Sequence, residues 1–259
     1  VVIAPNALSG LITPSTPPAI CEGKTITLLA PAGGVSYLWS DDNGTTTPVL
    51  TVGEEGTYKV TLTDAEGCTY APPAVNVEMN PAPDALIKAL IINELGQIIA
   101  NSYPALTVCE GEDVTLQAVS SSFSNYSWSG GNGFSQIIDF TEDRGNQLNV
   151  GTYVYTVTVT NFTTGCTVVA DPFVVTVNPV PSGFSISSSG LCAGDPNILT
   201  YAGPQPANWQ LIWNTGLPGP TLTTEDPGVF HIRVINEFGC EARSNALTVL
   251  PGPPVSVVF

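Results

Sequence analysis

The sequence predicts an all-β protein in which three similar β-sandwich domains follow one another along the chain. Val, Ile, Leu and Thr are frequent, and 25 Gly and 23 Pro interrupt them, as in other chains of many short strands and turns. One strand-like segment occurs in three versions, which read GTYKVTLTDAEGC, GTYVYTVTVTNFTTGC and GVFHIRVINEFGC. Apolar and polar residues alternate along each version, as they do in a strand that is buried on one face.

Each repeat carries an opening cysteine, a tryptophan, an aromatic residue in a later strand and a closing cysteine. These landmarks are Cys21, Trp39, Tyr58 and Cys68, then Cys109, Trp128, Tyr153 and Cys166, then Cys192, Trp213, Phe230 and Cys240. The opening cysteines are 88 and then 83 residues apart (109 − 21 and 192 − 109), which suits a sandwich of about 100 residues or slightly fewer. We therefore expect domains at residues 1–80, 81–179 and 180–259, with the six aromatic landmarks in their cores.

A proline junction follows the last strand of each repeat, in AVNVEMNPAP, FVVTVNPVP and ALTVLPGPP. We expect the first residues of the chain to be the junction strand of a preceding unit, and residues 252–259 to begin a following one. A terminal strand without a partner tends to pair with an exposed sheet edge. Either the chain is a section of a longer array, or one copy associates head to tail with the next through its terminal strand.

The segment from about residue 85 to 100, ALIKALIINELGQIIA, departs from the repeat pattern. Leu86, Ile87, Leu90 and Ile91 fit one face of a helix, yet the Ile-rich runs on either side of NELG fit a hairpin equally well. The all-β surroundings favour the hairpin. Such a hairpin would extend the first sheet of its domain or offer an apolar surface for lateral contact.

Charge and hydropathy exclude several classes of partner. The chain has 22 acidic residues against 6 Lys plus Arg and a formal net charge of −16 at pH 7, so phosphate backbones would be repelled and we expect no nucleic acid. No apolar run approaches the roughly 18 residues that span a bilayer, so we expect no membrane insertion. Six cysteines with one histidine and no C-x-x-C pattern favour disulfides over a metal site, and with them an extracellular or cell-surface location.

Taken in order, the motifs C-x-G, V/I-T-L, aromatic-x-W, G-T-Y-x-V-x-V, G-C and V-T-V-N-P resemble a known family. They are similar to the Ig-like and PKD-like repeats of large surface and secreted proteins of Bacteroidota, which include gliding-motility adhesins and other cargo of the type IX secretion system. The resemblance covers essentially the whole chain. It implies Ig-like sandwiches arranged as an extended rod, with a structural or adhesive role.

Two disulfide schemes are open. Small secreted domains commonly pair the two cysteines of one domain. In an Ig-like sandwich, however, the strand after the opening cysteine and the strand before the closing one run parallel, so the two cysteines lie at opposite ends. A disulfide needs Cα atoms within about 7 Å. Strand order therefore slightly favours pairing between neighbouring domains, Cys21 with Cys166 and Cys109 with Cys240.

No catalytic pattern is present, because the sequence lacks G-x-S-x-G, H-E-x-x-H, Walker and dinucleotide glycine motifs. We therefore expect no enzyme and no cofactor. Asp41, Asp42 and Asn43 are weak candidates for Ca²⁺ ligands through their side-chain oxygens. Clusters of Asp, Asn and Gly are more often plain turns.

The leading prediction is a non-catalytic structural protein of the cell exterior, as a stalk or adhesin section or as the subunit of a filament. With disulfides between domains, Cys68 and Cys192 remain to join one copy to the next. The alternatives are a module that binds a surface glycan or a protein, for example at the loop of residues 129–136, and an accessory region of a secreted enzyme. The repeated tryptophans occupy core positions of their strands, which counts against stacking on sugars.

Overall fold

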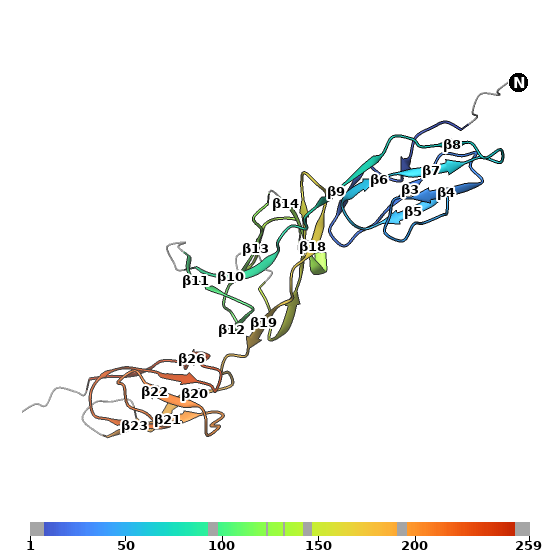
Figure 1. The fold of residues 1–259 in the computed structure, drawn as a ribbon. Coiled ribbons are helices and arrows are strands. Elements are labelled where there is room, and N and C mark those ends of the chain that lie inside the picture. Colours follow the sequence, from blue (N-terminus) through green and yellow to red (C-terminus); the bar gives the residue numbers. More distant parts are fainter. Residues whose placement is uncertain are drawn as a thin grey trace, which may run out of the picture. The chain divides into compact units, whose positions relative to one another are not determined.

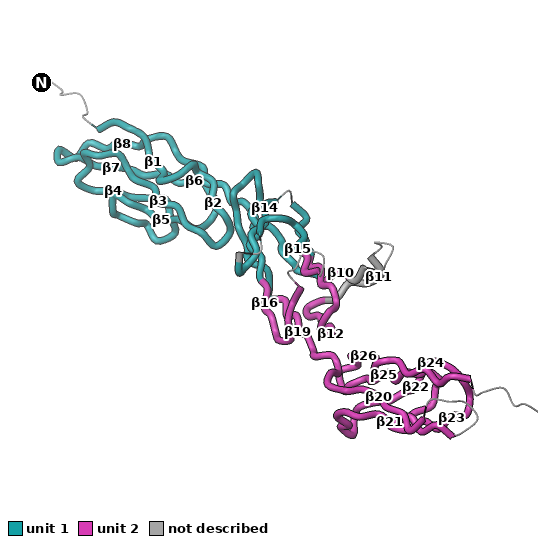
Figure 2. Tube along the Cα trace, turned by 180° about the vertical axis from the view of Figure 1, so that it is seen from behind, with its two compact units in different colours: residues 1–88, 117–138, 156–172 teal, residues 89–116, 139–155, 173–259 magenta. Residues whose placement is uncertain are grey.

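The computed structural model describes residues 8–92, 98–122, 124–131, 133–141, 147–190 and 196–251. These residues form short strands and one 3-10 turn, η1 (Ser129–Gly131), which confirms the all-β class (Figure 1). The chain divides into two compact units, residues 1–88 with 117–138 and 156–172, and residues 89–116 with 139–155 and 173–259 (Figure 2). The middle repeat contributes to both units.

The first repeat lies within the first unit and is an Ig-like sandwich. Its strands form three hydrogen-bonded sets, with the orders β1-β3-β5, β2-β9-β6 and β4-β7-β8. β6 and β7 are parts of one strand interrupted at Lys59. The bounds are β1 (Thr13–Pro14), β2 (Ala19–Cys21), β3 (Ile26–Leu29), β4 (Ser36–Trp39), β5 (Val49–Val52), β6 (Gly56–Tyr58), β7 (Val60–Thr63), β8 (Thr69–Tyr70) and β9 (Val75–Asn80).

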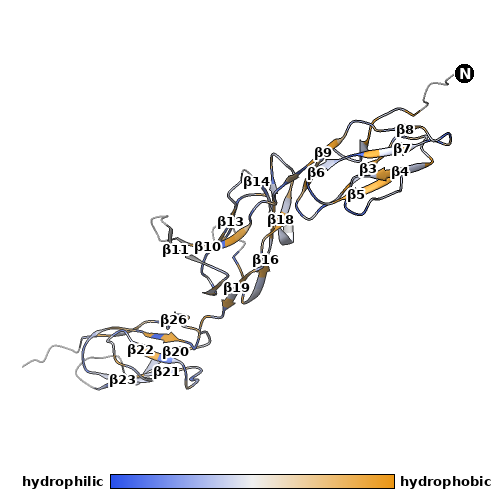
Figure 3. Cartoon of the chain, in the orientation of Figure 1, coloured by the Kyte–Doolittle hydropathy of each residue, from blue (hydrophilic) through white to orange (hydrophobic). Residues whose placement is uncertain are grey.

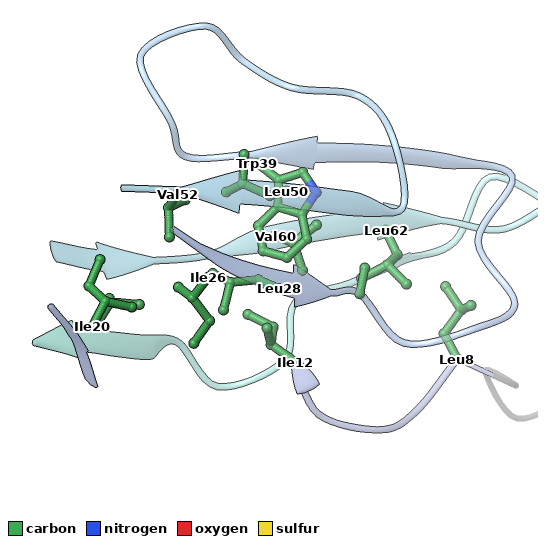
Figure 4. Close-up of a cluster of buried hydrophobic side chains, with 12 residues drawn as sticks. Leu8, Ile12, Ile20, Ile26, Leu28, Trp39, Leu50, Val52, Val60 and Leu62 are labelled. Atoms are coloured by element: carbon green, nitrogen blue, oxygen red, sulfur yellow. The ribbon is translucent and has the colours of Figure 1, made fainter. Parts of the chain in front are cut away.

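The core of the first repeat follows the alternation that the sequence predicts. Alternate residues of β3 and β7 enter one hydrophobic cluster, in which Leu28 and Leu62 are fully buried (Figure 4). Trp39 lies in the same cluster and donates a hydrogen bond from Nε1 to the Thr47 carbonyl at 2.9 Å. Leu8 also packs in this cluster. The first repeat therefore begins at Leu8 or earlier.

Strands of the middle repeat lie in three sheets. These sheets have the orders β11-β10-β13-β15, β12-β19-β16 and β14-β17-β18. Hydrophobic residues concentrate on the strands, for example on β13 (Figure 3). The bounds are β10 (Leu86–Ile92), β11 (Ile98–Ser102), β12 (Ala105–Cys109), β13 (Val114–Val119), β14 (Ser124–Trp128), β15 (Ile137–Phe140), β16 (Gly151–Tyr155), β17 (Val157–Asn161), β18 (Thr167–Val169) and β19 (Phe173–Asn178).

The irregular segment of the middle repeat is a pair of antiparallel strands and not a helix. β10 pairs with β11 through Ala89 opposite Ser102 and Leu90 opposite Asn101. β11 is one of the two edge strands of its four-stranded sheet. The segment therefore adds a strand to that sheet, which is the first of the two roles that the sequence left open for a hairpin.

The third repeat lies within the second unit. Its sheets have the orders β20-β21-β23, β22-β25-β26 and β24-β27. Trp213, Phe230 and Leu199 belong to its own hydrophobic cluster, separate from that of the first repeat. The bounds are β20 (Ser185–Ser188), β21 (Asn197–Ala202), β22 (Gln210–Trp213), β23 (Thr221–Thr224), β24 (Gly228–Phe230), β25 (Ile232–Ile235), β26 (Glu241–Arg243) and β27 (Leu247–Val249).

Two of the six predicted core aromatics are only half-buried. Tyr58 and Tyr153 each donate a hydrogen bond from the hydroxyl to the carbonyl four residues earlier, Glu54 and Asn149, at 3.0 Å. This bond keeps the end of each ring at the surface. In the middle repeat Tyr155, in the same strand, is buried. The three landmark tryptophans and Phe230 are buried as expected.

Candidate functional site: the disulfide clasps

The predicted Ca²⁺ candidates can be checked against the side chains of the described residues. The described part of the chain contains no group of three or more His, Cys, Asp and Glu side chains that could hold a metal ion. Both carboxylate oxygens of Asp41 accept hydrogen bonds from Thr45, at 2.8 Å from its N–H and 2.7 Å from its hydroxyl. The hydroxyl bond is the main reason that the pKa of Asp41 lies below its usual value. Asp41 therefore serves a turn, while Asp42 and Asn43 lie beside it in the same loop.

No helix of the described residues has the length and apolar character needed to cross a membrane. The candidate site lies at the junctions between repeats, where residues far apart in the sequence meet. These junctions contain four of the six cysteines.

In the first repeat, a parallel strand pairing places the opening cysteine at the end of the repeat that faces the following one. β2 runs parallel to β9, and Cys21 lies opposite Asn80, the last residue of β9. Both strands therefore end where the chain leaves for the next repeat. A turn follows directly, in which Lys24 donates its N–H to the Cys21 carbonyl at 2.9 Å. Gly23 has φ +74° in this turn, a conformation that favours glycine.

The closing cysteines sit in one kind of hairpin, which we call the cysteine hairpin: Asp64–Cys68, Asn161–Cys166 and Asn236–Cys240. Each begins with Asp or Asn, whose backbone N–H donates to the cysteine carbonyl at 2.8–3.0 Å. The glycine before the cysteine has φ between +71° and +84°, and a Cβ there would meet no atom within 4 Å. The turn therefore requires glycine for its backbone conformation and not for space.

The first unit contains the first clasp, a disulfide between Cys21 and Cys166. Its S–S distance is 2.02 Å and its Cα–Cα distance is 5.5 Å. The Cys166 Sγ atom lies 3.9 Å from the Asn80 carbonyl oxygen, which also accepts the Glu22 N–H at 3.0 Å. The disulfide therefore holds the cysteine hairpin of the middle repeat against the last strand of the first.

The second unit contains the second clasp, between Cys109 and Cys240, with the same Cα–Cα distance of 5.5 Å. β12 runs parallel to β19, so Cys109 lies opposite Asn178, and Cys240 Sγ lies 4.0 Å from the Asn178 carbonyl oxygen. Both disulfides thus follow the scheme between neighbouring repeats that strand order favours. In the first and middle repeats, the two cysteines lie at opposite ends of the strand that runs from Gly56 to Thr63 or from Gly151 to Asn161. The separation is at least about 25 Å, which no disulfide spans.

Asn236 adds a polar contact to the second clasp that cysteine spacing alone does not indicate. Its side chain, in a residue only 6 % exposed, accepts the Cys240 N–H at 2.9 Å through Oδ1. Its Nδ2 donates to the Pro179 carbonyl at 2.7 Å. The side chain thus joins the hairpin of the third repeat to the linker that precedes it. The sequence places an Asp or Asn four or five residues before each closing cysteine. In the middle repeat, however, Asn161 Oδ1 accepts the N–H groups of Thr163 and Thr164, so this recurrence does not predict the contact to the linker.

Cys68 occupies the same hairpin position but has no disulfide partner among the described residues, and it is exposed. Cys166 and Cys240, by contrast, are 0 % and 1 % exposed. The hairpin of Cys68 has the same hydrogen bond as that of Cys240, since Asp64 Oδ1 accepts the Cys68 N–H at 2.7 Å. Cys192 lies outside the described residues, as do residues 1–7 and 252–259 at the chain ends. The predicted roles of these segments stay predictions.

Comparisons with known proteins find likeness of structure only. No protein-family model matches the chain, and no curated protein matches it. Domains 3–5 of the extracellular part of Drosophila OTK are 12% identical, cover 91% of this chain and 94% of that one, and give a TM-score of 0.34. Fibronectin(III)-like modules of Clostridium thermocellum CbhA are 13% identical, cover 65% and 95%, and give a TM-score of 0.33. We take no function from either similarity.

Proposed function

We propose that the chain is a section of a non-catalytic structural array outside the cell, in which Ig-like repeats are bonded covalently end to end. It serves as a stalk or adhesin section, or as the subunit of a filament. The observation that carries the proposal is that both disulfides join the end of one repeat to a hairpin of the next. Disulfides persist in oxidising compartments, which supports an extracellular or cell-surface location. The finer assignment to repeats of the Bacteroidota type rests on the motif resemblance.

Energetics support a structural role for the clasps. They span 145 and 131 residues of sequence, for which the chain-entropy model gives a stabilisation of up to about 5 kcal/mol each. A bond at the junction also removes the freedom of the Pro-containing linker beside it. Repeats held in this way would transmit tension and bending from one to the next, as a stalk requires.

Small-angle X-ray scattering tests the stalk. We expect the oxidised chain to scatter as a stiff rod about three domains long. The double variant Cys166→Ser/Cys240→Ser should keep folded repeats but show a broader distribution of maximum dimensions. All chains in this comparison carry Cys68→Ser, which prevents bonding between copies through Cys68, so the single variant Cys68→Ser takes the place of the parent. A compact particle, or equal distributions for the parent and the double variant, would refute the proposal.

Self-association is the second part of the proposal. Cys68 stands in the hairpin that bonds to an opening cysteine in the other two repeats, and Cys192 follows the C-x-G pattern of opening cysteines. We propose that Cys68 of one copy bonds to Cys192 of another, with exchange of terminal strands supporting the contact. In a longer array, the opening cysteine of a preceding repeat would take the same place.

Mixed-isotope mapping tests this association. Equal amounts of ¹⁴N and ¹⁵N protein are oxidised together, digested without reduction and analysed by mass spectrometry. We expect Cys68–Cys192 peptides of mixed isotope, and a ladder of multimers on non-reducing gels that Cys68→Ser abolishes. Recovery of this link only in unmixed isotope form, or of Cys68 as a free thiol, would count against association through these cysteines.

A glycan-binding module is the second candidate function, and one surface hollow favours it. The hollow measures about 400 Å³ in the third repeat and is lined by Trp209 with Gln205, Gln210 and three prolines. Trp209 donates from Nε1 to Glu237 at 2.6 Å, which fixes the indole. The loop of residues 129–136 offers less, because Trp128 is buried and donates to the Ser135 carbonyl. A glycan array with Trp209→Ala as control tests this alternative.

A further inference from the structure

The two disulfides interleave along the sequence, because Cys109 lies between Cys21 and Cys166, while Cys166 lies between Cys109 and Cys240. We infer that the interleaving makes the chain a load-bearing tether. The disulfides limit how far the distance between Cys21 and Cys240 can grow under load, and most of this limit remains after either disulfide is lost. This property deepens the proposed structural role. It depends only on covalent connectivity, so it holds whether or not copies associate.

Connectivity decides how load is shared. The bond between Cys21 and Cys166 makes one branch point, and the bond between Cys109 and Cys240 makes a second. Each of the three chain segments between these cysteines then begins at one branch point and ends at the other. Load applied at the two ends of the chain enters at Cys21 and leaves at Cys240. The three segments therefore act in parallel, and none can be stretched beyond the shortest.

The shortest segment, from Cys109 to Cys166, sets the limit. From the differences in residue number (109 − 21, 166 − 109 and 240 − 166), and at about 3.5 Å per residue, the extended segments reach about 310 Å, about 200 Å and about 260 Å. Without disulfides, the chain from Cys21 to Cys240 reaches about 770 Å on the same scale. Even when all repeats are unfolded, the distance from Cys21 to Cys240 can therefore reach only roughly a quarter of its value without disulfides.

The limit survives the loss of one bond. Without the first clasp, load passes from Cys21 along the chain to Cys109 and through the second clasp, so the limit is about 310 Å. Without the second clasp, load passes through the first and then from Cys166 to Cys240, so the limit is about 260 Å. Loss of one bond therefore adds only about 110 Å or about 60 Å to the reach.

A chain with disulfides within each repeat would extend differently under load. Its three disulfide-closed loops would lie one after another along the path of the load. The segments that bear load would be those between the loops, about 140 Å from Cys68 to Cys109 and about 90 Å from Cys166 to Cys192 when extended. Loss of the bond within the middle repeat would then release the whole segment from Cys109 to Cys166, about 200 Å. The two arrangements have similar limits when intact, so the single variants tell them apart.

The limiting segment, from Cys109 to Cys166, contains the main core strands of the middle repeat. Leu116, Trp128 and Val157 of this segment are buried. The tether therefore reaches its limit only after the middle repeat has unfolded. Reduction of both clasps removes the limit, so we also expect a roughly fourfold longer reach in a reducing solution.

Optical-tweezer unfolding of the full chain, with handles beyond both termini, tests the inference. Relative to the oxidised parent, we expect Cys166→Ser to lengthen the fully unfolded chain by about 110 Å, Cys240→Ser by about 60 Å, and both together by about 570 Å. Cys68→Ser is the control and should change nothing.

An increase of about 200 Å for Cys166→Ser, which pairing within repeats requires, would overturn the inference. So would a double variant whose increase equals the sum of those of the two single variants. These lengths are those of one molecule, so a failure of self-association would leave them unchanged.

Discussion

Asn236→Asp offers a sharp test of how the second clasp is built. The exchange keeps an oxygen that can accept the Cys240 and Phe238 N–H groups, which now lie 2.9 and 3.1 Å from Oδ1. It replaces the NH₂ group that donates to the Pro179 carbonyl at 2.7 Å with a second oxygen. Two acceptors would then face each other at a residue that is 6 % exposed.

The expected cost is about 2–3 kcal/mol at pH 7, since a buried hydrogen bond is lost and its acceptor is left without a donor. Burial and the facing Pro179 carbonyl disfavour the charged form, whereas the two N–H donors favour it. We expect the first two effects to prevail and raise the pKa of the introduced carboxyl, so that the folded state binds the proton more tightly than the unfolded state does. The lost stability should therefore return as the pH falls through that raised pKa, because the protonated acid can donate to Pro179 again.

Native-state hydrogen exchange, read by mass spectrometry and corrected for the intrinsic rate at each pH, measures the loss locally. We expect faster exchange in the peptide that contains Cys240, and recovery of protection at low pH. Asp64→Asn is the matched control in the equivalent exposed hairpin, and should stay within about 0.5 kcal/mol of the parent. Equal protection in the Asn236→Asp variant and the parent at pH 7 would refute the role of this side chain.

Three further predictions concern the repeats themselves. Leu28→Ala, at a fully buried position, should destabilise the first repeat by about 2–5 kcal/mol in urea unfolding, whereas Leu38→Ala, at a position 57% exposed, should cost less than about 0.5 kcal/mol. The pKa of Asp84 is lowered chiefly by hydrogen bonds from Ser121, so Asp84→Ala should unfold more easily than the parent at pH 7. That difference should vanish in acid as the parent carboxylate is protonated; a difference that persists at pH 2 would contradict it. Burial raises the pKa of Tyr155 to about 12, so it contributes stability below about pH 10 that is lost as the pH rises through 12; ultraviolet titration should lose its last step in Tyr155→Phe.

Much of the fold could be predicted from the sequence because it depends on local patterns. Alternation along the strands placed Trp39, Trp128 and Trp213 in their cores, and this holds in the structure. Tyr58 and Tyr153 follow the same alternation, but it cannot indicate that their hydroxyls bond to Glu54 and Asn149. That contact depends on how the preceding turn folds back over the ring.

The candidate site could be predicted only in part. The spacing of the cysteines and the strand order favoured bonds between repeats, but left the alternative open. The parallel pairing of β2 with β9 decides the matter, because it places Cys21 beside Asn80 at the end of the first repeat. The roles of Asn236 and Pro179 depend on the same kind of junction and are not predicted by the sequence.

By itself, then, the sequence determined the class of fold, the core tryptophans and the glycine in each cysteine hairpin, and it predicted three repeats. Each of these depends on residues close together in the chain, through strand alternation or a single turn. The tertiary structure alone decided which cysteines meet, because the partners are 145 and 131 residues apart. Only the course of whole strands brings such distant residues to a Cα–Cα distance of 5.5 Å, which lies within the limit of about 7 Å for a disulfide.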